Sequence, residues 1–178
     1  MSGKVEIVSL AAPIADDALG ELADVLADCV AGGASVSFMA PFPSAQALAF
    51  FRKVEGSVAK GDTVLLAASL EGKIVGTVQL GLDTPPNQPH RAEIAKLMTR
   101  LAHRGKGIAS RLMRAAEALA VERGRTLLVL DTATEEGASG LYEKLGFTLT
   151  GEIPDFALKP HGGLTGTLVY WKRVGQPA

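Results

Sequence analysis

The stretch that most constrains the fold of this chain is residues 103–113, "HRGKGIASRLM". The apolar-rich residues 91–99 before it predict a strand, and apolar residues recur every three or four positions from Lys106 to Arg123, which predicts an amphipathic helix. A strand, a glycine-containing turn and a helix in this order expose the first unpaired backbone N–H groups of the helix, where the helix dipole adds partial positive charge. Phosphate is the natural ligand of such a place.

The two glycines of this stretch strengthen that interpretation. Gly105 and Gly107 permit the backbone angles and the close approach that a wrapped phosphate requires, while Arg104 and Lys106 can add charge-assisted contacts. Two familiar phosphate-binding patterns are excluded by spacing, because the chain has neither G-x-G-x-x-G nor G-x-x-x-x-G-K-[ST]. The alternative interpretation is a glycine-containing turn whose cations are solvated.

Periodicity and turn residues predict the remaining elements. We expect strands at 4–10, within 62–82 as a hairpin turning at 71–73, and at 91–99, 125–131, 147–153 and 165–173, and helices at 16–33, 44–58, 106–123 and 135–145. The run at 125–131 is continuously apolar, which is typical of a strand buried on both faces. The order of strands and helices predicts a mixed α/β sheet.

Composition limits the domain organisation and the classes of partner. With 178 residues, 47% of them hydrophobic, the chain predicts a single domain over residues 1–178. A formal net charge of −1 supplies no global field that would attract nucleic acid or an anionic membrane. One cysteine, the lack of a secretory signal pattern and the lack of an apolar run of roughly 20 residues favour a cytoplasmic protein without membrane segments.

Two motifs resemble signatures of the GNAT superfamily of N-acetyltransferases. "RGKGIA" matches the family's pyrophosphate loop R/Q-x-x-G-x-G/A and stands between a strand and a long helix, and "ASGLYEKLGF" at 138–147 resembles its A-x-x-L-Y-x-x-x-G-F segment. The resemblance extends over nearly the full length and implies a mostly antiparallel sheet of about six to seven strands flanked by about four helices. The C-terminal third looks like the branch that contains tabtoxin-resistance acetyltransferases.

This resemblance implies a site for acetyl-CoA as co-substrate. The pyrophosphate would be held by the loop and first helical turn, and the pantetheine arm by the main chain of the preceding strand, where residues 91–99 and 126–132 would splay apart. The residues concerned are Leu97, Met98, Thr99, Arg104, Gly105, Lys106, Gly107, Ile108, Ala109 and Ser110. The chain departs from many relatives at Glu135, where they carry an asparagine that contacts pantetheine.

The resemblance also assigns catalytic candidates. Acetyl transfer needs a neutral amine and a proton for the departing thiolate, and Tyr142 occupies the position of the family's general acid; the alternative is a core tyrosine satisfied by one hydrogen bond. Glu93 and Asp131 are both candidates for the base, and no dedicated base is needed if the amine is already neutral. The three histidines show no metal-ligand spacing, so no metal is expected.

The acceptor is the least constrained feature of the sequence. We expect the loop around residues 35–42 and the last hairpin, including Phe156, His161, Tyr170 or Trp171, to line its site, with "PDFALKPHGG" as a long polar connection. The leading hypothesis is acetylation of a small-molecule amine, such as an amino-acid-like or β-lactam toxin. The alternatives are a protein or peptide N-terminus as acceptor, or a non-catalytic acyl-CoA-binding sensor. The resemblance is also compatible with a homodimer.

Overall fold

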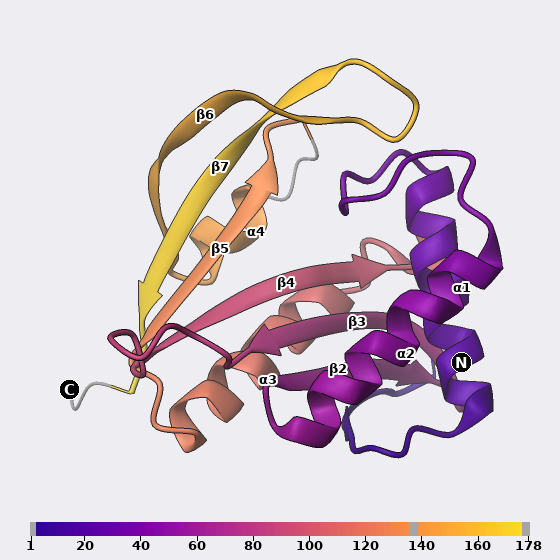
Figure 1. The fold of residues 1–178 in the computed structure, drawn as a ribbon, viewed down its shortest axis with the longest axis horizontal. Coiled ribbons are helices and arrows are strands. Elements are labelled where there is room, and N and C mark those ends of the chain that lie inside the picture. The colour runs from indigo at the N-terminus through magenta and orange to yellow at the C-terminus, as the bar shows by residue number, and fades with distance from the viewer. Residues whose placement is uncertain (1–2, 136–138, 176–178) are drawn as a thin grey trace.

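The computed structural model describes residues 3–135 and 139–175, which form a seven-stranded mixed sheet with helices on both faces (Figure 1). The strands are β1 (Val5–Leu10), β2 (Thr63–Leu70), β3 (Lys73–Gly81), β4 (Arg91–Thr99), β5 (Leu127–Ala133), β6 (Thr148–Leu158) and β7 (Leu164–Arg173). The helices are α1 (Asp16–Ala31), α2 (Ser44–Lys60), α3 (Ile108–Glu122) and α4 (Ser139–Lys144), with a 3-10 turn η1 (Leu101–His103). The predicted order of elements is confirmed.

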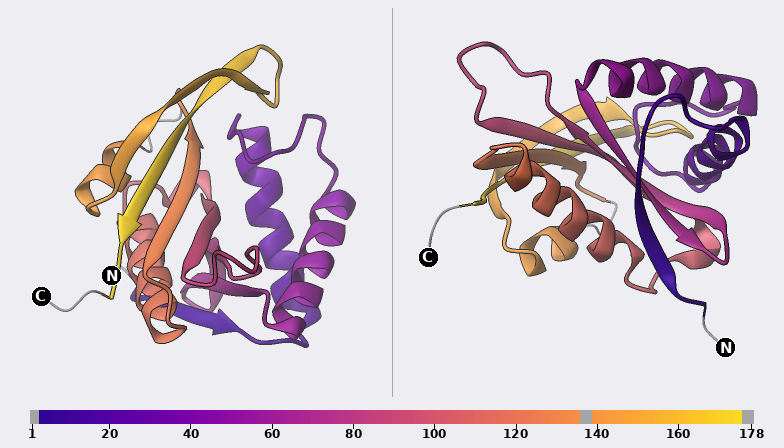
Figure 2. Two further views of the ribbon diagram at one scale, coloured as in Figure 1. Left: turned by 60° about the vertical axis from the view of Figure 1, so that its left-hand side comes forward. Right: turned by 90° about the horizontal axis from the view of Figure 1, so that it is seen from below.

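Different helices cover the two faces of the sheet, as Figure 2 shows. Side chains alternate along β2, so that Val64, Leu66 and Ala68 pack in the core beneath α3, whereas Leu65 and Ala67 pack in the core beneath α1 and α2. A strand exposes successive side chains to opposite faces, and one apolar strand therefore serves two cores. No described helix combines the length and the apolar character needed to cross a membrane.

The strand order β1-β2-β3-β4-β5-β7-β6 contains one parallel pair, β4 and β5. These two strands are in register only at their first residues, where Arg91, Ala92 and Glu93 face residues 127–129. Beyond that point β4 continues beside β3 and β5 continues beside β7, so the sheet opens between them. The expected splaying of these two strands is present.

A β-bulge interrupts β4 within the splayed part. Thr77 pairs with Met98 but Gln79 pairs with Ala95, so two residues of β3 span three residues of β4. The extra residue is accommodated at Lys96, whose φ is 53°. A bulge of this kind redirects the side chains that follow it.

β5 differs from the prediction in its burial. Leu128, Leu130 and Thr132 are buried, but the alternating residues, including Asp131, are partly or fully exposed. The expectation that this strand is buried on both faces is wrong, because one of its faces borders the opening between β4 and β5. Asp131 consequently lies on the open face.

The last hairpin also differs from the prediction. β6 continues through Leu158, with an irregularity between Ile153 and Ala157 at which Asp155 has a φ of 52°. The connection to β7 therefore covers only residues 159–163. The expectation of a long connection over residues 154–163 is wrong, because β6 continues into that segment, where Ala157 and Leu158 pair with Thr165 and Leu164 of β7.

Candidate active-site cleft

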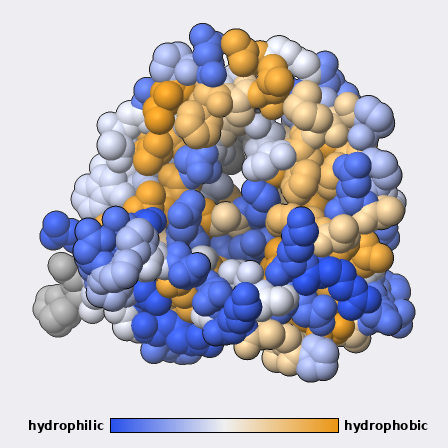
Figure 3. Space-filling model, viewed as in Figure 1, coloured by the Kyte–Doolittle hydropathy of each residue, from blue (hydrophilic) through white to orange (hydrophobic). Residues whose placement is uncertain are grey.

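The opening between β4 and β5 forms a cleft of about 630 Å³. It is seen as a hollow in the centre of one face, between the β5 side and the loop that links α1 to α2 (Figure 3). Its wall combines main chain and side chains from five places in the sequence. The lining residues are Cys29, Gly32–Ser37, Ile94–Thr99, Arg104, Ala109, Asp131, Thr132, Glu135, Leu141 and Tyr142.

The glycine loop adjoins the cleft at the start of α3. Gly105 and Gly107 have φ values of 75° and 74°, and a Cβ added at either residue would meet nothing within 4 Å. Ile108 is buried and anchors the first helical turn in the core. No described side chain caps the N-terminus of this helix, so its first N–H groups remain available to an anion.

The two cations of the loop point in different directions. Arg104 lines the cleft, where its Nε donates to the Thr99 carbonyl at 3.3 Å and its Nη2 lies 4.0 Å from the Cys29 sulfur. Lys106 instead borders a separate depression beside β1. Burial raises the pKa of the Cys29 thiol, and the opposing effect of Arg104 is smaller, so this cysteine is a protonated wall residue at neutral pH rather than a nucleophile.

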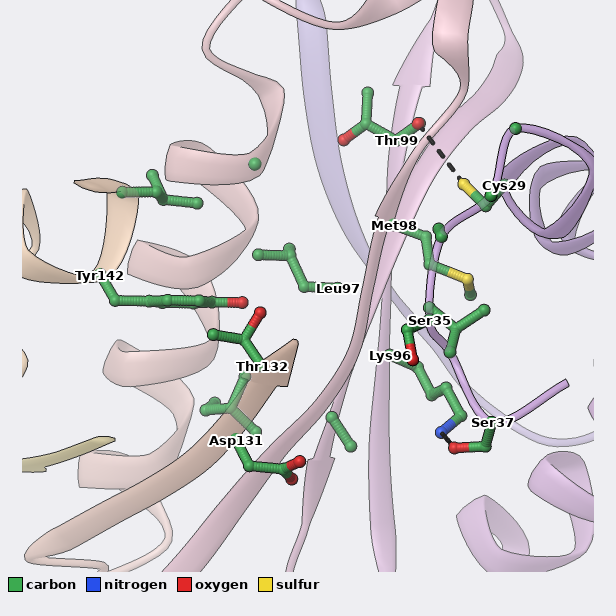
Figure 4. Close-up of a pocket in the computed structure, with 18 of the residues that line it drawn as sticks. Cys29, Ser35, Ser37, Lys96, Leu97, Met98, Thr99, Asp131, Thr132 and Tyr142 are labelled. Atoms are coloured by element: carbon green, nitrogen blue, oxygen red, sulfur yellow. Dashed lines mark hydrogen bonds between the residues drawn. The ribbon is translucent and has the colours of Figure 1, made fainter. Parts of the chain in front are cut away.

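The strand residues that were expected to hold the pantetheine arm all lie at the cleft. Leu97, Met98 and Thr99 line it, and Ala109 lines it from the first turn of α3. In Figure 4, Leu97 projects to the side of Tyr142, whereas Met98 projects to the side of Cys29. Gly105, Ile108 and Ser110 are not among the lining residues, since they lie at the loop and helix behind this opening.

Tyr142 combines a core position with access to the cleft. It is only 6% exposed, and its ring packs against Phe147 and Tyr170 at centroid distances of 6.1 and 5.7 Å. Its hydroxyl points into the cleft toward Leu97 (Figure 4). Packing therefore holds the ring in an orientation that directs the hydroxyl into the cleft.

The structure distinguishes between the acidic residues that were candidates for the base. Asp131 lines the cleft, and its Oδ2 accepts a hydrogen bond from Thr167 Oγ1 at 2.9 Å. Glu93 is not among the lining residues; its carboxylate is exposed and lies 3.6 Å from the Arg91 guanidinium. Glu135 lines the cleft and accepts a hydrogen bond from Lys159 Nζ at 2.9 Å.

Lys96 is a cleft residue that the sequence interpretation missed. Its Nζ donates to Ser37 Oγ at 3.0 Å across the cleft wall, as drawn in Figure 4. Burial lowers the pKa of its ammonium group, and the negative charges of Asp131 and Glu93 oppose this shift without cancelling it. The sequence did contain one signal for this residue, namely a lysine within the largely apolar run "AEIAKLM". In a regular strand, however, its side chain would point to the opposite face of the sheet.

The loops expected at the acceptor side meet around the cleft. The backbone N–H of Ala40 donates to the Pro160 carbonyl at 2.9 Å, and His161 Nε2 lies 3.0 Å from the Ala31 carbonyl. These contacts join the β6–β7 connection to the α1–α2 loop. Of the aromatic candidates, Tyr170 is fully buried, whereas Phe156 and Trp171 are exposed away from the lining residues.

Comparisons with known proteins agree with this geometry. The family model for the acetyltransferase (GNAT) family matches residues 33–147. N-acetyltransferase 8B of Homo sapiens is 40% identical over 87 residues, which cover 48% of this chain and 38% of that protein. The matched segment thus spans less than half the length of that relative.

A second relative matches over most of its length. It is the L-methionine sulfoximine/L-methionine sulfone acetyltransferase of Pseudomonas paraeruginosa, 28% identical over 159 residues that cover 84% of this chain and 88% of the relative. Among solved structures, a protein from Salmonella typhimurium with its cofactor acetyl-CoA has a TM-score of 0.78 and 20% identity, covering 98% of this chain and 96% of its own. At that identity the likeness shows the fold.

Proposed function

The chain belongs to the acetyltransferase (GNAT) family, and we propose that it uses acetyl-CoA to acetylate the amine of a small molecule. The observation that carries this proposal is the enclosure of the cleft. Contacts of the β6–β7 connection with Ala31 and Ala40 bridge the two sides of the acceptor region. A bridged cleft suits a compact acceptor better than a continuous polypeptide.

The relatives support an acceptor that resembles an amino acid. The Pseudomonas relative, which matches 84% of this chain, is named for its action on L-methionine sulfoximine and L-methionine sulfone. We assign to this chain an acceptor of the same kind, in keeping with the tabtoxin-resistance-like appearance of its C-terminal third. A protein N-terminus as acceptor is the competing outcome of the substrate test below.

The described residues fit a bound CoA moiety. Two open glycines with positive φ and the uncapped start of α3 suit the pyrophosphate, and the unpaired edge of β4 over Leu97–Thr99 suits the amides of the pantetheine arm. Bound acetyl-CoA supplies the thioester carbon that the acceptor amine attacks. The main chain at the splayed strands therefore orients the thioester end toward Tyr142.

The chemical roles are assigned by position. Asp131 accepts the proton that the amine nitrogen loses when the new C–N bond forms, directly or through one water, because it lines the cleft, whereas Glu135, the other acid of the lining, is paired with Lys159. Tyr142 donates its hydroxyl proton to the sulfur as the C–S bond breaks, since its ring is fixed by packing while its hydroxyl faces the cleft. Glu93, exposed beside Arg91, takes no direct part.

Replacement of Tyr142 tests this assignment. We expect Tyr142→Phe to lower kcat by about 100-fold, within the usual range for loss of a general acid, while the Kd for acetyl-CoA changes less than about twofold. The measurement is thiol release with an active amine, together with calorimetric titration of acetyl-CoA. Tyr170→Phe is the matched control, because it removes a buried hydroxyl from the ring that packs on Tyr142.

Two results would contradict the proposal. An equal loss of kcat in Tyr142→Phe and Tyr170→Phe would show that only packing has been disturbed. Acetylation of peptide N-termini in preference to a panel of small amines would reject the small-molecule acceptor while leaving the acetyltransferase activity intact.

A further inference from the structure

Two strained residues meet in the acceptor side of the cleft. Four described non-glycine residues have positive φ: Ser37, Glu71, Lys96 and Asp155. Glu71 lies in the tight turn between β2 and β3, and Asp155 lies in the irregular part of β6. Lys96 lies in the β4 bulge and Ser37 in the α1–α2 loop, and these two residues are joined to each other by a hydrogen bond of 3.0 Å. Left-handed backbone at non-glycine residues is strained and is concentrated at ligand sites.

The β4 bulge is what brings Lys96 into the cleft. Ala92 and Ile94, before the bulge, point into the core beneath α3. Regular alternation would place residue 96 on that same apolar face. Met98 instead packs in the core beneath α1 and α2, so the bulge has reversed the faces. Lys96 consequently points toward Ser37 on the α1–α2 side (Figure 4).

The ammonium of Lys96 lacks a strong anionic partner among the described residues. None of the ion pairs formed by the part of the chain that the structure describes includes it. An ammonium group has three N–H donors, and Ser37 accepts one of them. A partly buried cation held by one hydroxyl is well placed to bind an anion that enters the cleft, because charge-assisted hydrogen bonds are about twice as strong as neutral ones.

The opposite wall of the same cleft carries the opposite charge. Asp131 lies on the open face of β5, and its negative charge acts on Lys96. A cavity with an ammonium on one wall and a carboxylate on the other complements a ligand that carries both charges. Each charged group of such a ligand would meet its counter-charge, and the ligand ammonium would lie beside the acid that removes its proton.

We propose that Lys96 and Ser37 form a receptor for the carboxylate of the acceptor, and that the acceptor is a zwitterionic amino acid acetylated on its α-amine. This inference rests on the proposed function, since it names the substrate class of the same cleft. Lys96 is a specificity-determining residue in this scheme. It binds the carboxylate, while Asp131 accepts the proton of the amine and Tyr142 donates a proton to the sulfur.

The test compares an amino acid with its amide. The probes are L-methionine sulfone and its carboxamide, which share the side chain and the amine but differ by the negative charge. We expect the unmodified protein to use the acid with a kcat/KM at least about tenfold above that of the amide, and Lys96→Met to bring this ratio close to one, mainly through KM. Lys96→Arg should retain part of the preference. Lys53→Met, an exposed lysine on α2, is the charge-matched control.

Binding provides a second readout that does not depend on turnover. Calorimetric titration of the acid and the amide into protein saturated with desulfo-CoA should show the same preference, and Lys96→Met should remove it. Equal use or equal binding of the two probes by the unmodified protein overturns the proposal, as does a lack of interaction with the acid. An equal loss for both probes in Lys96→Met also overturns it. In either case, CoA release by the same protein preparations with amines that lack a carboxylate would show that the proposed acetyltransferase function is correct even though the carboxylate receptor is not.

Discussion

Glu21 shows how one side chain can tie a helix to the sheet. Its Oε1 accepts a hydrogen bond from Lys73 Nζ at 2.8 Å, and its Oε2 accepts one from the Ile74 backbone N–H at 2.8 Å, so α1 is fastened to the start of β3. Burial raises the pKa of this carboxyl, but the hydrogen bonds and the positive charges of Lys73 and Arg100 together hold it below its ordinary value. Because its folded-state pKa is lowered, ionised Glu21 stabilises the fold above its unfolded-state pKa.

We therefore expect Glu21→Gln to reduce the free energy of unfolding at about pH 7 by about 1 kcal/mol, because the amide keeps the contact with the Ile74 N–H but loses the charge. The difference should shrink as the pH falls through the lowered pKa of Glu21, where the carboxyl of the unmodified protein is also neutral. Urea denaturation of both proteins at about pH 7 and about pH 3 checks this. Stability differences that are the same at the two pH values would contradict the electrostatic account.

The glycine loop and α3 form the element to which we assign the pyrophosphate of acetyl-CoA. Gly107 has a φ of 74° and stands directly before the helix, with open space where a side chain would project. A β-branched residue would fill that space and oppose the backbone conformation. Gly124, with a φ of 72° and equally open surroundings, follows the other end of the same helix.

We expect Gly107→Val to weaken acetyl-CoA binding by at least about tenfold, and Gly124→Val to leave the Kd within about twofold. Both variants should lose stability, because each forces a β-branched residue into the left-handed region. Calorimetry and thermal unfolding of the pair separate the two effects. Unchanged acetyl-CoA affinity in Gly107→Val would remove the loop from the binding site.

Local sequence patterns were sufficient to predict most elements but not their irregularities. The strand at 91–99 was predicted with its observed bounds, and the helix after Gly107 within two residues, since periodicity and glycine caps act over a few residues. The bulge at Lys96 depends on the pairing of β4 with β3, which the sequence does not display. The extension of β6 to Leu158 likewise depends on its pairing with β7.

The candidate site was predicted to the same extent. The family resemblance implied roles for Tyr142 and for the strand residues 97–99, and the end of the neighbouring strand suggested Asp131; the structure brings these residues to one cleft. The role of Lys96 could not be foreseen, because an uninterrupted strand would direct it to the opposite face. The structure was also needed to distinguish Asp131, which lines the cleft, from Glu93, which does not. The sequence pattern places these two acids on neighbouring strands and does not show which of them faces the cleft.

At the scale of the whole molecule, the cleft follows from the way two sheet segments meet. β1–β4 are held between α3 and the α1–α2 pair, whereas β5, β7 and β6 form a second segment that shares only three residue pairs of register with β4. Among the described residues, the core beneath α3 contains residues of both segments, whereas the core beneath α1 and α2 contains residues of the first segment and its helices alone. We propose that the opening between the two segments admits the pantetheine arm from the side of the glycine loop and the acceptor from the side of the α1–α2 loop.

The measurement that tests this account most directly is a calorimetric titration of the purified protein with acetyl-CoA, with ATP and desulfo-CoA as controls. We predict saturable binding of acetyl-CoA at least about tenfold tighter than that of ATP, and binding of desulfo-CoA close to that of acetyl-CoA, since the pyrophosphate and pantetheine contacts do not need the sulfur. No binding, or affinity equal to that of ATP, would contradict the assignment of the glycine loop and the splayed strands to the CoA site.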